Sequence, residues 1–356
     1  MKILIDIGHP GHVHYFKNFY KIMKSKAHDF LFISRDKEVS FALLNHYNIP
    51  YISRGKGKKS FLGKLIYMLY ADFIILKSAL KFKPDLFLSF GSPYAAQISF
   101  LTNKPNIVID DTEVGKFEQF FYKLFSKVIL TPSSFYKNFG EKQVRFDGFM
   151  ELCYLHSSFF TPDNSVLNKY NLSKSESYSL IRFVSWDASH DRNETGLTYS
   201  QKKNIIKTCL KYGKVIISSE GKLPKEFQKY ELKIMPEDLH QLLSFASLYV
   251  GEGATTASEC AMLGTPSIYI NSIDAGTIRE QQKYGLLTHF KNGKNVDQFI
   301  DQLLKNIELN KEYELGREKM LNEKINLTPF LVWFVENYPE SLTIMKENPD
   351  YQYRFK

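Results

Sequence analysis

Short apolar runs alternate with longer amphipathic stretches along the first half of the chain. Short apolar runs bounded by turn residues are typical of buried strands, and a 3.6-residue period is typical of helices. The pattern predicts strands at Lys2–Ile7, Phe30–Ser34, Asp85–Phe90, Asn106–Asp110 and Val128–Thr131. It predicts helices at Val13–Lys24, Glu38–Asn45, Leu62–Phe82, Tyr94–Leu101 and Phe117–Phe125. Such alternation indicates a parallel sheet with helices on both faces.

The same alternation restarts after residues 151–176, a polar stretch that contains TPDN and SKSES and suits a linker. Further strands are expected at Tyr178–Val184, Val215–Ser218, Leu232–Ile234, Leu248–Val250 and Ser267–Ile270. Further helices are expected at Gln201–Tyr212, Glu237–Phe245, Thr255–Leu263, Thr277–Tyr284 and Val296–Asn306. We therefore expect two α/β domains, residues 1–160 and 177–328. In the C-terminal segment, 329–356, an aromatic helix at about Pro329–Tyr338 is expected to pack back on the first domain.

Positive charge is concentrated in the first domain. Residues 1–150 hold 22 Lys and Arg against 12 Asp and Glu, whereas the remaining residues hold 25 against 26. Part of the excess lies at Arg54, Lys56, Lys58, Lys59, Lys64, Lys77, Lys81 and Lys83. Such a field suits nucleic acid, an anionic polymer or an anionic membrane surface. No nucleic-acid fold signature is present, so nucleic acid is not an expected partner.

The predicted helix Leu62–Phe82 interleaves lysines with aromatic residues, among them Tyr67, Tyr70 and Phe73. Such a helix either rests on anionic lipid or is a core helix with solvated lysines. The 356 residues are 44% apolar and 24% charged, which is typical of a globular protein. Three widely spaced cysteines argue for a reducing compartment. No signal peptide or membrane span is evident, so we expect a cytoplasmic protein, with peripheral membrane attachment as a candidate.

The loop GEGATTASE follows the apolar run Leu248–Val250 and opens a helix. Small residues at such a turn let a phosphate approach the backbone, and the helix N-terminus adds N–H donors and a favourable dipole. Glu259 lies two turns into the helix, at a reach suited to two vicinal ribose hydroxyls. The alternative is a tight turn with Glu259 on a solvated face. The candidate ligand-binding residues are Gly251, Glu252, Gly253, Ala254, Thr255, Thr256 and Glu259.

A second loop, GHPGHVH, follows the first predicted strand and carries three histidines within six positions. Histidine exchanges protons near neutral pH, so we place His12 first and His9 second as the catalytic base. Gly11 and His14 are expected on the acceptor side of the same loop. The alternative is that one or two of the histidines cap the following helix. A metal site is not expected, because no nearby carboxylate or cysteine completes a ligand set.

Clustered carboxylates follow the predicted strand Asn106–Asp110. Like charges at a strand end can raise one pKa and create a general base, so Asp110 is a third catalytic candidate, with Asp111 beside it on the acceptor side. The commoner use of Asp and Thr at such a place is to cap a helix. Three weaker loops end other strands. The first contributes Gly91 and Ser92 on the acceptor side. The second contributes Ser185 and Trp186, of which the indole could stack on a nucleotide base or close a cleft. The third contributes Ser219, which could contact the diphosphate or the nucleotide base.

Beyond these residue types, GATTASECAMLGTPSIYI resembles the donor-site segment of GT-B glycosyltransferases. The resemblance is greatest to the lipid-linked peptidoglycan N-acetylglucosaminyltransferase, whose pattern is GALTVSE followed by A-A-x-G-x-P. It implies that Glu259 binds the ribose and that Gln281 and Gln282 contact the donor sugar. Gly11 and His12 align with the end of that family's GGTGGH loop. Nucleotide-sugar 2-epimerases share the fold and a related helix, but the motif flanking their catalytic carboxylate is not reproduced here.

Five segments in the same order, GHPGH, SFGSPY, FDGFMEL, FVSWDASHD and GEGATTASE, resemble the landmarks of the domain-of-unknown-function 354 family. The resemblance implies a GT-B fold, with two Rossmann-like α/β domains facing a central cleft. In open α/β sheets ligands bind outside the carboxyl ends of the strands, which is where every loop above is expected.

The resemblance implies a glycosyltransferase that moves a sugar from a nucleotide-diphosphate donor, UDP-linked for preference, to a polysaccharide or lipid-linked acceptor of the cell surface. No cofactor and no metal are expected, since a helix end can stabilise the leaving diphosphate. One alternative is a nucleotide-sugar 2-epimerase or hydrolase, which needs no acceptor. Another is a non-catalytic nucleotide-sugar-binding protein.

Overall fold

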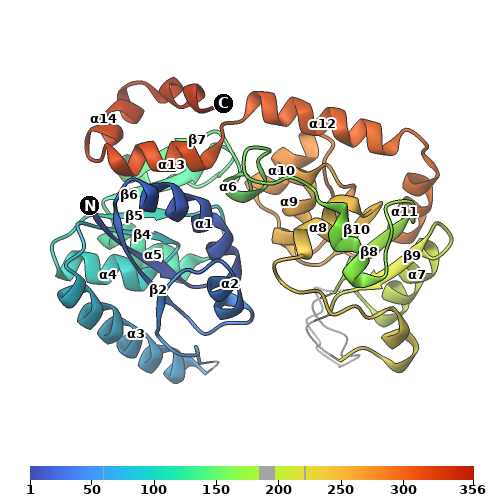
Figure 1. Ribbon diagram of the computed structural model, residues 1–356, viewed down its shortest axis with the longest axis horizontal. Helices are drawn as coiled ribbons and strands as arrows, with labels where there is room; N and C mark the ends of the chain where they lie inside the picture. Colours follow the sequence, from blue (N-terminus) through green and yellow to red (C-terminus); the bar gives the residue numbers. More distant parts are fainter. Residues whose placement is uncertain (59, 184–196, 220–221) are drawn as a thin grey trace. The chain divides into compact units, whose positions relative to one another are not determined.

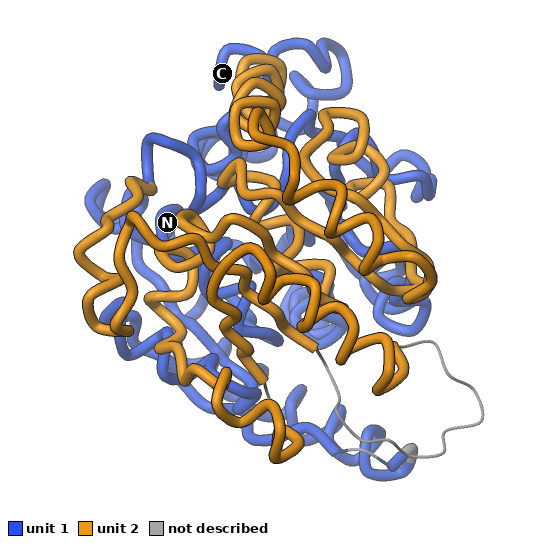
Figure 2. Tube along the Cα trace, turned by 90° about the vertical axis from the view of Figure 1, so that its right-hand side faces the viewer, with its two compact units in different colours: residues 1–159, 324–356 blue, residues 160–323 orange. Residues whose placement is uncertain are grey.

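A computed structural model describes the chain except for residues 59, 184–196 and 220–221. The chain forms two compact units (Figures 1 and 2). Unit 1 holds residues 1–159 together with 324–356, and unit 2 holds residues 160–323. In the described part of the chain, no helix combines the length and the apolar character needed to cross a bilayer.

Unit 1 contains a parallel sheet of seven strands in the order β3-β2-β1-β4-β5-β6-β7. The strands are β1 (Lys2–Ile7), β2 (Asp29–Ser34), β3 (Tyr51–Ser53), β4 (Leu86–Phe90), β5 (Asn106–Ile109), β6 (Val128–Pro132) and β7 (Gln143–Phe146). Because all strands run parallel, the loops after β1, β4 and β5 lie along one carboxyl edge.

Helices cover both faces of this sheet. One face packs against α3 (Phe61–Phe82), α4 (Pro93–Leu101) and α5 (Lys116–Phe125), through cores that include Leu4, Ile75, Ile98, Val108 and Tyr122. A second group of contacting helices contains α1 (Pro10–Ser25), α2 (Ser40–His46), α6 (Leu152–Leu155) and α13 (Leu327–Glu336). The buried strands are almost wholly apolar, as parallel strands covered on both faces must be.

The C-terminal segment belongs to unit 1, and Figure 2 shows it in the colour of the first 159 residues. Its helices are α13 and α14 (Glu340–Glu347). Helix α13 contacts α1 and α6, and Phe330 lies against Phe146 of β7. Lys324 Nζ lies 2.6 Å from Asp147 Oδ1 at the start of the segment. These contacts explain why a segment so late in the sequence completes the core of the first unit.

Unit 2 contains a parallel sheet of five strands in the order β12-β11-β10-β8-β9. The strands are β8 (Tyr178–Arg182), β9 (Lys214–Ile217), β10 (Leu248–Gly251), β11 (Ser267–Ile270) and β12 (Thr288–Phe290). The helices are α7 (Tyr199–Cys209), α8 (Leu239–Phe245), α9 (Ala254–Leu263), α10 (Gly276–Lys283), α11 (Val296–Lys305) and α12 (Leu309–Glu323).

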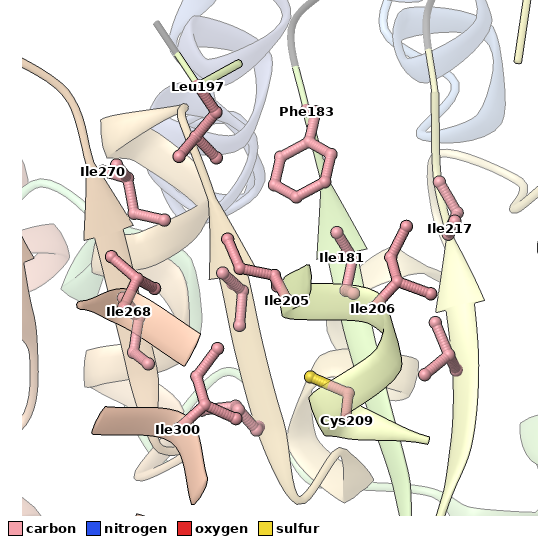
Figure 3. Close-up of a cluster of buried hydrophobic side chains, with 14 of the residues drawn as sticks. Ile181, Phe183, Leu197, Ile205, Ile206, Cys209, Ile217, Ile268, Ile270 and Ile300 are labelled. Atoms are coloured by element: carbon pink, nitrogen blue, oxygen red, sulfur yellow. The ribbon is translucent and has the colours of Figure 1, made fainter. Parts of the chain in front are cut away.

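An apolar core of unit 2 lies between the sheet and helices α7 and α11 (Figure 3). Ile181, Ile217 and Ile268 enter it from the strands, and Ile205 and Ile300 enter it from the two helices. Leu248 and Val250 of β10 also belong to this core, whereas Tyr249 does not. Alternate residues of a strand point to opposite faces, so Tyr249 and Gly251 share the face that α9 covers.

The predicted long elements agree with the structure to within three residues at nearly every end, but short elements do not. The sequence pattern missed β3, β7 and β12, each of only three or four residues. It also missed two helices, α12 with 15 residues and α14 with eight. The strand expected at Leu232–Ile234 is absent from the described residues, where Glu231 makes only an isolated bridge to Ile217. Part of the expected linker is also packed structure, because α6 is fully buried in unit 1. Residues 160–176 belong to unit 2.

Candidate functional site

The loop after β10 exposes the N-terminus of α9 at the carboxyl edge of the unit 2 sheet. Gly253 is the N-cap residue, and glycine has no side chain with which to cap the helix. A Cβ atom built on Gly253 would meet no atom of the described residues within 4 Å, so these residues leave the space beside this turn open. Gly253, Ala254 and Thr255 are partly exposed, whereas Thr256 is buried. The first turn of α9 therefore presents backbone N–H donors to an open space, an arrangement suited to phosphate oxygens.

Gly251 and Glu252 serve the structure of the loop. A Cβ atom on Gly251 would lie 2.1 Å from the Tyr249 hydroxyl oxygen and 2.9 Å from the Arg182 carbonyl oxygen, so only glycine fits. The Glu252 N–H donates to the Arg182 carbonyl at 3.2 Å. Its buried carboxylate accepts from the Leu197 N–H at 3.0 Å and lies 3.8 Å from Lys202 Nζ. The amides expected for a diphosphate therefore begin at Gly253.

Glu259 forms a buried pair with a histidine that the sequence analysis did not consider. His240 Nε2, from α8, lies 2.9 Å from Glu259 Oε1, and the two residues are 3% and 4% exposed. Glu259 is therefore not on a solvated face, and His240 fixes one of its carboxylate oxygens. The two residues are 19 positions apart on different helices, so no local motif could have indicated the pair.

The two glutamines of α10 have different surroundings. Gln281 is fully buried, and its Oε1 accepts a hydrogen bond from Ser258 Oγ of α9 at 3.1 Å. Its Nε2 is buried with no hydrogen-bond partner among the described residues. Gln282 is exposed, and its Oε1 accepts from the His289 N–H at 3.1 Å. Gln281 is thus packed against the helix that carries Glu259, and Gln282 is the member of the pair that solvent reaches.

Arg182 is the residue of this edge that sequence reasoning overlooked. It ends β8, and strand pairing sets it opposite Gly251. Burial raises the pKa of Tyr249, and the nearby Arg182 guanidinium opposes that rise. The Tyr249 hydroxyl lies against Gly251, so a positive charge stands close to the loop before α9. The available signal was a single basic residue at the end of an otherwise apolar strand.

Two other candidate loops of unit 2 are less informative. Ser185 and Trp186 lie outside the described residues. Ser219 is half-buried just beyond β9, where the preceding Ser218 N–H donates to the Ile181 carbonyl. Ser219 therefore lies at the same carboxyl edge as Gly253.

In unit 1, backbone hydrogen bonds set the tautomers of His9 and His12. The Gly8 N–H donates to His12 Nδ1 at 3.2 Å, and the Gly11 N–H donates to His9 Nδ1 at 3.2 Å. An Nδ1 that accepts a hydrogen bond carries no proton, so each neutral ring bears its proton on Nε2. Burial, His9, Lys37 and Arg54 together hold the pKa of His12 well below 6.5. The neutral His12 ring therefore offers an N–H donor rather than a base.

The other two candidates in this loop are engaged by the fold. Gly11 lies in the first turn of α1, where its amide is bonded to His9, the N-cap residue. His14 is buried on α1, with its ring 5.1 Å from that of Tyr154 and its Nδ1 3.4 Å from Lys17 Nζ. Neither residue is presented to the carboxyl edge as His12 is.

The two aspartates after β5 also differ. Asp110 is 4% exposed and accepts from Tyr122 Oη, from Gln119 Nε2 at 3.4 Å and from the Thr112 N–H at 3.0 Å. It anchors α5 and the loop before it. Asp111 is half-buried, and its Oδ1 accepts from Thr112 Oγ1 at 3.0 Å. Burial and the neighbouring Asp110 carboxylate raise the pKa of Asp111, and burial also raises the pKa of Asp110. Asp111 is the more exposed of the two and has fewer hydrogen bonds within the fold, so it is the better placed to exchange a proton with a bound acceptor.

Ser92 belongs to a buried ion-pair cluster that the sequence analysis missed. Its Oγ donates to Asp6 Oδ2 at 2.6 Å and accepts from the Ala95 N–H, so it both caps α4 and stabilises the Asp6 carboxylate. Asp6 also accepts from Arg54 Nε at 2.8 Å and from Arg54 Nη2 at 3.2 Å. Gly91 has a φ of +56°, a left-handed conformation that favours glycine. The sequence GSP is thus explained by backbone geometry and by Asp6.

The cluster leads to a pH-dependent prediction at Asp72 of α3. Burial and the nearby Asp6 raise the pKa of Asp72 from 3.8 to about 7, and its Oδ1 is buried without a hydrogen-bond partner among the described residues. Because the pKa is higher in the folded chain, ionised Asp72 destabilises the fold above about pH 7, and the penalty disappears as the pH falls toward about 4. We expect Asp72→Asn to raise the unfolding free energy by on the order of 1–3 kcal/mol at about pH 8.

Urea unfolding measured across this pH range tests the prediction. Asp29→Asn, at a largely exposed position 3.7 Å from Lys24 Nζ, is the control and is expected to leave the stability unchanged. A gain from Asp72→Asn that is the same at about pH 4 as at about pH 8 would show that charge is not the cause.

Among the residues that the structure describes, no group of three or more His, Cys, Asp or Glu side chains is placed to hold a metal ion. Cys153, Cys209 and Cys260 are all buried free thiols, and burial raises the pKa of Cys209 to about 12. These thiols lie in the packed interior of the two units and add no ligand set to either sheet edge.

Known proteins share both the sequence pattern and the architecture. A family model described as a protein of unknown function, DUF354, matches residues 1–338. An uncharacterized protein from Methanocaldococcus jannaschii is 24% identical over 287 residues, which span 75% of this chain and 81% of that protein.

Two solved structures illustrate the range of similar folds. The UDP-GlcNAc 2-epimerase from Neisseria meningitidis bound to UDP-GlcNAc is 14% identical, with a TM-score of 0.67 over 94% of this chain and 99% of that chain. MurG from Acinetobacter baumannii is 16% identical, with a TM-score of 0.58 over 94% of this chain and 99% of that chain. The expected α/β GT-B fold is therefore confirmed, and glycosyltransferases and UDP-GlcNAc 2-epimerases both have it.

Proposed function

The chain belongs to the DUF354 family of proteins of unknown function, and we propose that it is a glycosyltransferase that uses a nucleotide-diphosphate sugar. The observation that carries the proposal is the N-terminus of α9, where Gly253 has no capping side chain and the described residues leave the space beside it open. Its amides, from Gly253 to Thr256, would hold the diphosphate, with Arg182 as the nearby positive charge. An uncapped helix end stabilises a leaving diphosphate without a metal ion.

On the acceptor side, we assign different roles to two residues of the unit 1 edge, Asp111 and His12. Asp111 would accept the proton of the acceptor hydroxyl, because it is the more exposed of the two aspartates and its pKa is raised by burial and by Asp110, as suits a general base. The Nε2–H of His12 would donate a hydrogen bond that orients the acceptor, and the low pKa of His12 keeps the ring neutral for that role. Asp110 supports this loop from within, through Tyr122 and Gln119.

The acceptor proposed here is a polysaccharide or a lipid-linked glycan of the cell surface, and the donor is UDP-linked. The N. meningitidis epimerase structure holds UDP-GlcNAc, which supports a UDP-sugar as the first donor to test. Thermal-shift measurements against a panel of nucleotide sugars identify the donor. Stabilisation by at least one of them is expected, and its complete absence would contradict the proposal.

The role of Glu259 is tested with Glu259→Gln, which keeps the size of the side chain and removes its charge. If Glu259 accepts from the ribose hydroxyls, UDP binding is expected to weaken by about 10- to 100-fold, the usual worth of hydrogen bonds to a charged group. Isothermal calorimetry with UDP and with 2′,3′-dideoxy-UDP separates this role from the internal pair with His240. The variant and the wild type should bind the dideoxy compound equally. Equal weakening for both compounds would show that the substitution acts through the fold.

Transfer is distinguished from the alternative activities by leaving out the acceptor. The proposed transferase leaves a bound nucleotide sugar largely unchanged without an acceptor, whereas a 2-epimerase or a hydrolase converts it. Chromatography of the nucleotide sugar after incubation therefore decides between these classes. Donor binding that survives both His12→Ala and Asp111→Asn, with no turnover of the wild type under any acceptor tested, would favour a binding protein instead.

A further inference from the structure

Large apolar side chains lie exposed on three consecutive helices of unit 1. They are Leu62, Ile66, Leu69, Phe73 and Leu80 of α3, Phe100 and Leu101 of α4, and Phe117, Phe120 and Leu124 of α5. Each is between 53% and 69% exposed. We call this set the α3–α5 face. Single exposed apolar residues are ordinary, but ten on neighbouring helices are a feature of a binding surface.

The three helices lie next to one another on the same side of the sheet. Helix α4 contacts both α3 and α5, and the rings of Phe100 and Phe125 are 5.3 Å apart. Figure 1 shows α3 and α4 running along the outside of unit 1. On α3, Tyr67, Ala71, Ile75 and Ala79 point into the core at a four-residue spacing. The exposed apolar residues of α3 therefore form a separate stripe on its outer side.

Lysines are interleaved with these apolar residues. Exposed lysines occur at Lys64, Lys77 and Lys81 on α3 and at Lys116 and Lys123 on α5. Lys142 lies near Lys123 and Lys127 at the end of α5. Its pKa is lowered first by partial burial and then by the positive charges of these two lysines. The only acidic residues of the three helices are Asp72, which is largely buried toward Asp6, and Glu118.

We propose that the α3–α5 face binds the surface of an anionic lipid bilayer. Lysine is depleted at the centre of protein–protein interfaces, whereas at a bilayer surface its long stem lies along the apolar region and its ammonium reaches the lipid phosphates. The apolar residues of the face match the apolar region of a bilayer, and its lysines, with almost no acidic residues, match the negative charge of an anionic lipid surface. The sequence analysis considered this partner for α3 alone, and the structure adds α4 and α5.

The position of the face gives it a use that rests on the proposed function. In a parallel α/β unit each helix begins near the carboxyl edge of the sheet, so Leu62, Ile66 and Phe117 lie toward the edge that carries His12 and Asp111. A bilayer held on this face would bring a lipid-linked acceptor to that edge. Its lipid tail would remain in the bilayer while its polar end reached the two candidate residues.

The test is co-sedimentation of the full chain with vesicles of phosphatidylcholine alone or mixed with phosphatidylglycerol. We expect binding to the mixed vesicles, and we expect it to weaken with added salt, as an electrostatic contribution requires. The triple variant Leu69→Ser/Phe73→Ser/Phe120→Ser is expected to lose at least about tenfold in affinity. Lys77→Glu/Lys81→Glu is expected to lose about as much, because each lysine contributes about fivefold at an anionic surface.

The matched control is Met235→Ser/Ile307→Ser/Leu315→Ser, which removes three apolar residues of unit 2 that are 55%, 95% and 57% exposed. It should bind vesicles like the wild type. The proposal is overturned if the wild type binds neither vesicle, if both triple variants lose binding equally, or if the face instead joins two copies in sedimentation velocity. Thermal shift with the donor nucleotide sugar should be unchanged in all variants. The two proposals can therefore fail independently. Loss of vesicle binding leaves donor binding unchanged, and absence of donor binding leaves vesicle binding unchanged.

Discussion

A Gly253→Asp variant is expected to lose nucleotide-sugar binding by about 100-fold while its melting temperature stays the same or rises slightly. Aspartate is a preferred N-cap residue, and the φ and ψ of Gly253, −97° and 121°, suit any residue. The new carboxylate would accept from the same amides of α9 that are proposed to hold the diphosphate, and its charge would repel the diphosphate. Two lost hydrogen bonds to a charged group cost about 3 kcal/mol, which is about 100-fold.

Gly253→Asn is the matched control, because asparagine has the same shape and caps a helix equally well but carries no charge. It should weaken binding by about tenfold or less, with the same melting temperature as the aspartate variant. Calorimetric titration with the stabilising nucleotide sugar measures both. If the aspartate variant bound the donor as tightly as the wild type, the diphosphate would lie elsewhere and the donor site proposed for α9 would be wrong.

The second large effect concerns stability and lies at Arg54. The Arg54 guanidinium is 2% exposed, forms two hydrogen bonds to the fully buried Asp6 carboxylate and donates from Nη1 to Tyr67 Oη at 2.6 Å. Arg54→Met would leave the Asp6 carboxylate buried without its cation. Breaking a buried pair from one side costs about 3–5 kcal/mol, so we expect a loss of that size in the unfolding free energy of unit 1.

Two comparisons separate this effect from a general loss of packing. The double variant Asp6→Leu/Arg54→Met removes both charges and should be more stable than Arg54→Met alone. Lys26→Met, at a half-exposed pair with Glu336, should cost no more than about 1 kcal/mol. Urea unfolding followed by the fluorescence of Trp333, in a Trp186→Phe background, reports on unit 1. A double variant less stable than the single one would contradict the ion-pair explanation.

Most of the long elements could be predicted because their periodicity is local. Helix α12 was missed, since it buries only Leu309, Tyr313 and Met320 and so carries a weak apolar pattern. A helix such as α3 or a strand such as β1 carries its own apolar pattern, and the packed neighbours only adjust its ends. Strands β3 and β12 could not be predicted, since three residues carry too little pattern and owe their conformation to pairing with β2 and β11.

The candidate site divides in the same way. The N-terminus of α9 was predictable, because a glycine loop, a strand before it and a helix after it are all contiguous in sequence. The hydrogen-bond partners of the other candidate side chains could not be predicted. His240 meets Glu259 only because α8 packs against α9, and Ser92 meets Asp6 from 86 residues away only because β4 lies beside β1.

By itself the sequence determined the fold class, the order of most of the long elements and the location of the glycine loop, because each depends on interactions between residues close in the chain. Only the tertiary structure decided what each candidate side chain can do. It showed that Glu252 and Asp110 support their loops, that His12 Nδ1 accepts from the Gly8 N–H, and that three helices carry exposed apolar side chains. The protonation state of a side chain depends on its burial and its hydrogen-bond partners, and in the folded chain these neighbours come from residues far away in the sequence.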